Sequence, residues 1–143
     1  MNDRSFVLFV YGTLLPGESG HALLDGARAL GPGKTPAAYA LFDLGPYPAL
    51  VAGGATAVVG ELYEVPASML AAIDVHEEVP ILFKRTRIAL EDERVVETYV
   101  LEREQVVGRR RIRNGDWRAR FRVDPAPGAR DAAFVKWARR RER

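Results

Sequence analysis

Residues 6–14 read Phe-Val-Leu-Phe-Val-Tyr-Gly-Thr-Leu, and this stretch decides how the rest of the chain is interpreted. The five apolar residues 6–10 are typical of a buried strand, since β-branched and aromatic side chains pack well on a pleated sheet. The strand runs directly into Tyr11 and Gly12, where a short loop would leave backbone N–H groups exposed. Such groups bind anions, so we expect a carboxylate ligand at this loop. The alternative is that Gly12 only supplies backbone freedom at a strand end.

Outward from this strand, the pattern predicts an α+β protein. Further strands are expected at 37–44, 57–65, 84–90, 95–101 and 118–123, with turn signals between them. A helix is predicted over 67–75, where Leu70 and Ile73 share a face, and a second helix over 131–140. We expect one domain, residues 1–143, in which 124–143 form a basic helical extension.

Composition excludes several classes of protein. The 143 residues are 48% hydrophobic, which is enough for a packed core, and they include no cysteine and two histidines, His21 and His76. A disulfide scaffold, a thiol nucleophile and a cysteine zinc site are therefore excluded, and we expect no metal site. No apolar stretch approaches the roughly 20 residues of a membrane span, so we expect a soluble cytoplasmic protein.

Charge is distributed unevenly along the chain. The net charge is +2, but residues 1–104 carry 8 Lys+Arg against 15 Asp+Glu, whereas residues 105–143 carry 13 against 4. Arginines partly alternate with apolar residues between 109 and 122, which is typical of a solvated face of a sheet. The functional alternative is a patch that attracts an acidic partner, such as a carrier protein, an anionic substrate or nucleic acid. No nucleic-acid motif accompanies the arginines, so we do not expect nucleic acid as the partner.

Five segments occur in an order that resembles the γ-glutamyl cyclotransferase superfamily, in its small bacterial and γ-glutamylamine branch. They are Tyr-Gly-Thr-Leu at 11–14, Tyr-Pro-Ala-Leu at 47–50, Gly-Glu-Leu-Tyr at 60–63, Asp74-x-x-Glu77 followed by Arg85, and Gly-Asp-Trp at 115–117. The likeness covers most of residues 5–121. It implies a small mixed sheet that closes toward a barrel, with a few flanking helices.

The resemblance also implies an activity. Members convert a γ-glutamyl amine, or a γ-glutamyl-capped metabolite, into 5-oxoproline and a free amine, by attack of the substrate's own α-amino group on its γ-carbonyl. Some related enzymes remove a γ-glutamyl protecting group during the biosynthesis of aminoglycoside-type antibiotics. Because the two reacting groups are tethered, holding a folded conformer supplies much of the catalysis. No cofactor is implied.

Site residues follow from the same correspondence. Glu77 takes the place of the catalytic general acid and base, although the family's usual next residue is Gly and this chain has Glu78. Phe83 stands where Tyr is common. The residues expected to bind the γ-glutamyl group are Tyr11, Gly12, Thr13 and Leu14, with Tyr47 and Pro48 as a wall and Tyr99 on a strand that could face the site. For the wall residues and Tyr99, packing in the core is the alternative.

A second class of function stays open at this point. The same fold could serve as a non-catalytic binding module that acts on an acidic partner through its arginine-rich C-terminal region. The sequence does not identify the amine that an enzyme of this kind would release, the oligomeric state or the pathway.

Overall fold

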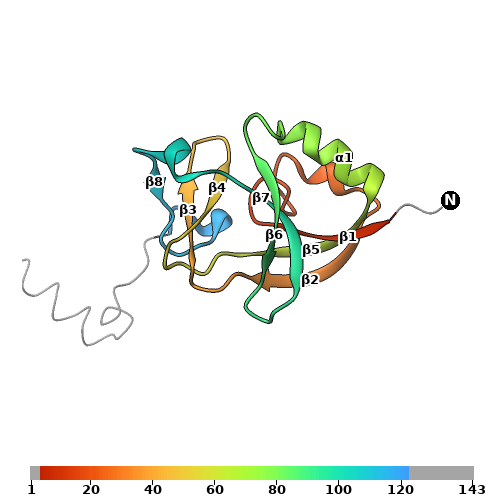
Figure 1. Ribbon diagram of the computed structural model, residues 1–143, viewed down its shortest axis with the longest axis horizontal. Helices are drawn as coiled ribbons and strands as arrows, with labels where there is room; N and C mark the ends of the chain where they lie inside the picture. Colours follow the sequence, from red (N-terminus) through yellow and green to blue (C-terminus); the bar gives the residue numbers. More distant parts are fainter. Residues whose placement is uncertain (1–3, 123–143) are drawn as a thin grey trace, which may run out of the picture.

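The computed structural model describes residues 4–122, which form one curled, mixed β-sheet with a single α-helix beside it (Figure 1). The strands are β1 (Ser5–Val10), β2 (Arg28–Lys34), β3 (Tyr39–Asp43), β4 (Pro48–Ala52), β5 (Val59–Pro66), β6 (Lys84–Ala89), β7 (Val95–Val100) and β8 (Arg110–Arg111). The helix is α1 (Ala67–His76), and three short 3₁₀ segments are η1 (His21–Leu24), η2 (Arg103–Val106) and η3 (Trp117–Ala119). This arrangement confirms the predicted α+β class and barrel-like sheet.

The opening strand lies at the centre of the sheet. The strand order is β2-β5-β1-β7-β4-β3-β8, and β6 pairs with β7 outside this path. β1 runs antiparallel to β5 and parallel to β7, while β4 also runs parallel to β7. The residue after β1, Tyr11, is hydrogen-bonded to Tyr99 of β7 and to Leu50 of β4, so the loop that follows begins beside both strands.

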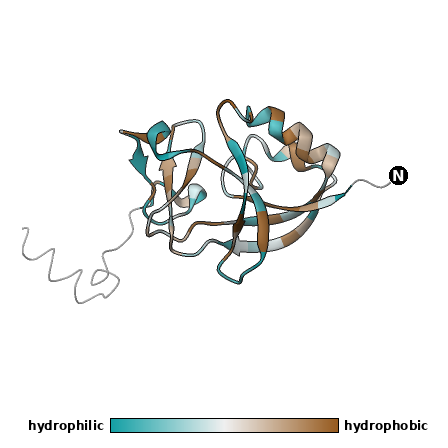
Figure 2. Ribbon diagram, viewed as in Figure 1, coloured by the Kyte–Doolittle hydropathy of each residue, from teal (hydrophilic) through white to brown (hydrophobic). Residues whose placement is uncertain are grey.

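Both faces of β1 are buried, which explains its continuous apolar run. Leu8 and Val10 belong to one cluster of buried side chains, together with Leu70 and Ile73 of α1. Phe9 and its neighbours on the opposite face belong to a second cluster. Figure 2 shows hydrophobic residues along the strands of the sheet and a hydrophilic loop between β6 and β7.

Most predicted elements are confirmed, with shifted ends. β1, β3, β5, β6 and β7 correspond to five of the expected strands, and α1 corresponds to the expected helix at 67–75. None of the helices within residues 4–122 is long and apolar enough to cross a lipid bilayer. The predicted helix at 131–140 and the extension at 124–143 lie outside the described residues.

The predicted strand at 118–123 is wrong over the residues described. The Asp116 carboxylate accepts a hydrogen bond from the Arg118 backbone N–H (3.1 Å), which starts η3 instead. Trp117 is only 1% exposed, and burial of this large ring fixes the turn against the second cluster. The alternation of arginine with apolar residues was the source of the wrong prediction.

Three strands were not predicted: β2 and β4, because their sequences look like turns, and β8, which has only two residues. β2 contains Pro32 between Gly31 and Gly33, but it lies at the edge of the sheet, where a missing proline N–H is tolerated, and its pairing with β5 includes an irregularity between Ala29 and Gly31. β4 is short, begins at Pro48 and pairs with β3 across a tight turn.

Candidate active site

One small pocket opens at the end of β1. Its lining residues are Phe9, Val10, Tyr11, Gly12, Thr13, Leu14, Tyr47, Pro48, Glu77, Phe83 and Tyr99. The volume enclosed by these walls, open solvent included, is about 330 Å³, and the part that a water-sized sphere can occupy is about 20 Å³. Pockets for small ligands are mostly apolar with a few polar groups. This pocket fits that description, because Glu77 is its only charged side chain.

Helix α1 carries Glu77 to the pocket. Leu70 and Ile73 bury one face of the helix, and the Glu77 backbone N–H donates to the Ile73 carbonyl oxygen (2.9 Å) at the end of its last turn. The next residue, Glu78, has φ of 56°, in the left-handed region where glycine is favoured. Glu78 is exposed, so its side chain points to solvent and the two adjacent carboxyl groups have separate surroundings.

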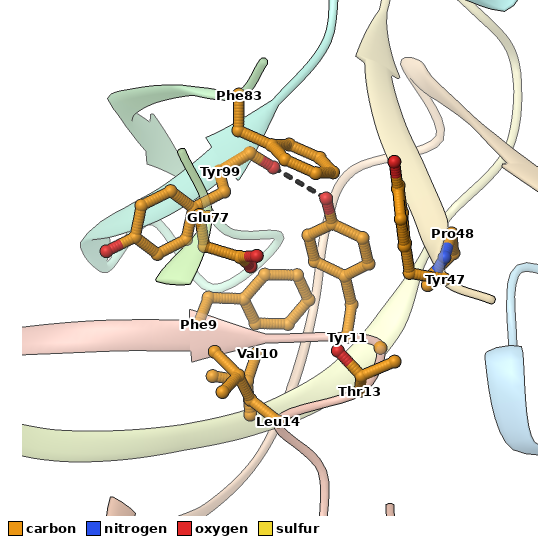
Figure 3. A pocket seen from close by; sticks show the side chains of 11 residues that line it. Phe9, Val10, Tyr11, Thr13, Leu14, Tyr47, Pro48, Glu77, Phe83 and Tyr99 are labelled. Carbon is orange, nitrogen blue, oxygen red and sulfur yellow. Dashed lines mark hydrogen bonds between the residues drawn. The ribbon is translucent and has the colours of Figure 1, made fainter. Parts of the chain in front are cut away.

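The Glu77 carboxyl group is unusual electrostatically. Figure 3 shows it pointing into the pocket, toward Phe9 and Tyr11. Within residues 4–122, its oxygens accept no hydrogen bond and form no ion pair. Burial raises its pKa from 4.5 to about 7, because the charged form loses solvation in the pocket. The group can therefore both take up and release a proton near neutral pH.

The loop after β1 supplies free backbone donors. The Leu15 N–H donates to the Gly12 carbonyl (3.0 Å) and the Gly20 N–H to the Thr13 carbonyl (2.7 Å), so the loop is held by its own hydrogen bonds. The N–H groups of Gly12, Thr13 and Leu14, however, donate to no acceptor among the described residues. Three successive free amides that line one pocket form a ready site for a carboxylate or an oxyanion.

Position 12 has no room for a side chain, so it requires glycine. A Cβ atom built on Gly12 would lie 2.6 Å from Cγ of Pro48, closer than real Cβ contacts. The glycine therefore lets the loop pack directly against the start of β4. This contact places Pro48 in the pocket wall, next to Tyr47, whose ring lies 5.7 Å from the ring of Phe83.

Tyr11 ties the three central strands together. Its hydroxyl donates to the Tyr99 carbonyl of β7 (2.6 Å) and accepts from the Leu50 N–H of β4 (3.1 Å), as Figure 3 shows for the first of these bonds. Burial raises the pKa of this hydroxyl far above its usual range, so it stays protonated. These two backbone hydrogen bonds occupy the Tyr11 hydroxyl, and the aromatic ring is the part of the side chain that faces the pocket.

Tyr99 also turns its hydroxyl away from the pocket. The hydroxyl donates to Oδ1 of Asp74 on α1 (2.7 Å), and the same oxygen accepts from Nε of Arg85 on β6 (2.9 Å). Arg85 then donates to the largely buried Glu97 (2.7 Å), which also accepts from Arg87 (2.8 Å). This network anchors the last turn of α1 to β6 and β7, one turn before Glu77.

All eight residues predicted for the site line this one pocket: Tyr11, Gly12, Thr13, Leu14, Tyr47, Pro48, Glu77 and Tyr99. The prediction missed Phe9 and Val10, the last two residues of β1, which also line the pocket. Phe83 was named only as part of a motif and not as a site residue. Strand alternation would have placed Phe9 on the same face as Tyr11. Among residues 4–122, no group of three or more His, Cys, Asp or Glu side chains is arranged to hold a metal ion.

Comparison with known proteins gives a consistent family. Residues 8–119 match the model of the family described as "Gamma-glutamyl cyclotransferase, AIG2-like". A putative γ-glutamylcyclotransferase of Vibrio cholerae is 46% identical over 82 residues, which cover 57% of this chain and 70% of that protein. The γ-glutamylaminecyclotransferase of Bos taurus is 37% identical over 100 residues, covering 61% of this chain and 57% of that protein, which is less than two thirds of its length.

A solved structure agrees with these matches. The crystal structure of an AIG2-like protein from Mus musculus is similar with a TM-score of 0.63 and 30% sequence identity, over 68% of this chain and 78% of that one. The likeness therefore extends from the sequence to the fold.

Proposed function

The chain belongs to the γ-glutamyl cyclotransferase, AIG2-like family, and from this premise we propose that it releases 5-oxoproline from a γ-glutamyl amine or a γ-glutamyl-capped metabolite, with Glu77 as general acid and base. The observation that carries the proposal is one pocket that holds both a partner-free carboxyl group with a pKa of about 7 and three free backbone amides.

The loop amides would bind the substrate first. The α-carboxylate of the γ-glutamyl group, or the oxyanion that develops on its γ-carbonyl, accepts hydrogen bonds from Gly12, Thr13 and Leu14. The rings of Tyr11, Tyr47 and Phe83 would limit the space, so that the four-atom chain folds back on itself. Folding brings the α-nitrogen to the γ-carbonyl carbon, and orientation of this kind is worth up to about 10⁵–10⁸ M in effective concentration.

Glu77 would then move one proton through the reaction. Its carboxylate takes a proton from the α-ammonium group, and the freed nitrogen attacks the γ-carbonyl carbon and forms the new C–N bond of the ring. The carboxyl group returns the proton to the departing nitrogen as the original amide C–N bond breaks. The ring nitrogen gives its second extra proton to solvent, so the products are 5-oxoproline and the free amine, and Glu77 ends ionised as it began. A pKa near 7 suits both transfers at neutral pH.

A panel of γ-glutamyl amines tests this function, with 5-oxoproline and the released amine detected by mass. The wild-type protein should turn over at least one member of the panel. Glu77→Gln should keep the fold and lower turnover by roughly 10²–10⁴, the usual contribution of a general acid–base group. Glu78→Gln is the matched control, because Glu78 is exposed and adjacent, and it should retain turnover. Equal turnover by wild type and Glu77→Gln would rule out the assigned role.

A further inference from the structure

A second hollow lies apart from the pocket at the end of β1. We call it the arginine hollow; its lining residues are Arg110, Arg111, Arg113, Asn114, Arg120, Phe121 and Arg122. It shares no residue with the pocket that contains Glu77. The space within it, open to solvent, is about 1,080 Å³. The reaction proposed for the pocket uses none of these residues.

The positive charge of the arginine hollow is largely unpaired. Arg110 donates to Asp43 (2.8 Å). Within residues 4–122, no carboxylate lies within ion-pair distance of the other four guanidinium groups, those of Arg111, Arg113, Arg120 and Arg122. Like charges held close together repel, and an anionic partner would relieve that repulsion.

Aromatic rings hold part of this charge in place. The Arg120 guanidinium lies 3.6 Å from the centre of the buried Trp117 ring and 4.7 Å from that of Phe121, while Arg110 lies 5.7 Å from the Phe121 ring. Arg120 also donates to the Trp117 carbonyl (2.9 Å). Stacking of this kind orients planar guanidinium groups, and their N–H forks match the two oxygens of a carboxylate.

Phe121 adds an apolar contact at the same place. Phe121 is 77% exposed although its side chain is large and hydrophobic. Arginine and aromatic residues are enriched where proteins bind one another, whereas lysine is depleted. All seven basic residues between 105 and 122 are arginine. The composition of the arginine hollow is thus that of a protein-binding surface.

Two observations favour a protein over a nucleic acid as the partner. Guanidinium groups already lie over the Phe121 ring, which leaves less of its face for a base to stack on. In addition, residues 1–104 carry 15 acidic against 8 basic residues, so a strand of phosphates that ran from the hollow over that part of the chain would meet net negative charge. A compact acidic surface avoids both obstacles.

We propose that the arginine hollow is a docking surface for an acidic face of a partner protein, one that presents Asp and Glu carboxylates around an apolar side chain. The carboxylates pair with the guanidinium groups that form no ion pair within residues 4–122, and the apolar side chain packs on Phe121. Docking at this surface does not depend on turnover at Glu77.

Fluorescence anisotropy with the full-length protein tests the proposal. One labelled probe is a Glu-rich peptide that contains leucine, and the other is an oligothymidylate of the same net charge. We expect the peptide to bind more tightly than the oligothymidylate, and added salt to weaken both. Arg111→Glu/Arg113→Glu should weaken peptide binding about tenfold or more, and Phe121→Ala should weaken it without changing the net charge. Both arginines are exposed, so the fold should be retained.

The control is a double variant with the same change of net charge elsewhere. Arg28→Glu/Lys34→Glu alters two residues of β2, on the other edge of the sheet, and should leave peptide binding within about twofold of wild type. Turnover of a γ-glutamyl amine by Arg111→Glu/Arg113→Glu should be unchanged. Three results would overturn the proposal: tighter binding of the oligothymidylate, an equal loss in the control, or no binding of the peptide at low salt.

Discussion

The buried carboxyl group of Glu77 should make the protein less stable as the pH rises from 4.5 to about 7. In the native state burial raises its pKa from 4.5 to about 7, whereas in the unfolded chain it ionises at its ordinary value. Between these values the native state holds a proton that the unfolded state has lost, so the free energy of unfolding falls with rising pH. Each pKa unit corresponds to about 1.4 kcal/mol, and the full cost above pH 7 is therefore about 3 kcal/mol.

Urea unfolding of the wild type and Glu77→Gln at pH 4 and pH 8 measures this cost. Glutamine has nearly the same shape and cannot ionise, so other titrating groups cancel when the two proteins are compared at each pH. Relative to wild type, Glu77→Gln should gain about 3 kcal/mol between pH 4 and pH 8. Glu78→Gln is the control, since its exposed side chain should contribute about 0.5 kcal/mol or less. A gain below about 1 kcal/mol for Glu77→Gln would refute the burial of this carboxyl group.

Three further predictions concern the residues around the pocket. Tyr11→Phe leaves a buried carbonyl and a buried N–H without hydrogen-bond partners. It should therefore lower the free energy of unfolding by about 2–4 kcal/mol in urea titrations. A loss below about 1 kcal/mol would show that the hydroxyl is not needed for stability. Glu78 adopts a left-handed backbone conformation, with φ of 56°, that glycine adopts without strain. Glu78→Gly should therefore raise the free energy of unfolding by about 1 kcal/mol. No increase would mean that the glutamate is unstrained. Tyr99→Phe removes the hydrogen bond to Asp74, which anchors α1. This variant should lower kcat and shift the pH profile of the reaction, with little change in KM. An effect on KM alone would instead indicate direct contact of Tyr99 with substrate.

The local parts of this site could be predicted from the sequence. The strand and loop at 6–14 were predictable because an apolar run and a following glycine act over a few neighbouring residues. The helix before Glu77 was predictable for the same reason. These two short segments contribute Glu77 and the three free amides, which are the polar groups on which the proposed chemistry depends.

The parts that depend on distant contacts could not be predicted. Strand alternation indicates that Tyr99 faces the interior, but only the packing of α1 on β7 shows that its hydroxyl reaches Asp74. Likewise, the sequence shows Glu78 where glycine is usual, and only the backbone shows that this position is left-handed while the side chain remains in solvent. The turn at Trp117 replaced a predicted strand because burial of its ring outweighs the local alternation.

The pH dependence of kcat/KM for a γ-glutamyl amine tests the central claim most directly. If Glu77 must be ionised to accept the proton of the α-ammonium group, kcat/KM should rise with pH along a limb whose pKa is about 7, as burial of Glu77 requires. A profile without an inflection between pH 6 and pH 8 would contradict the claim that this carboxyl group performs the proton transfer.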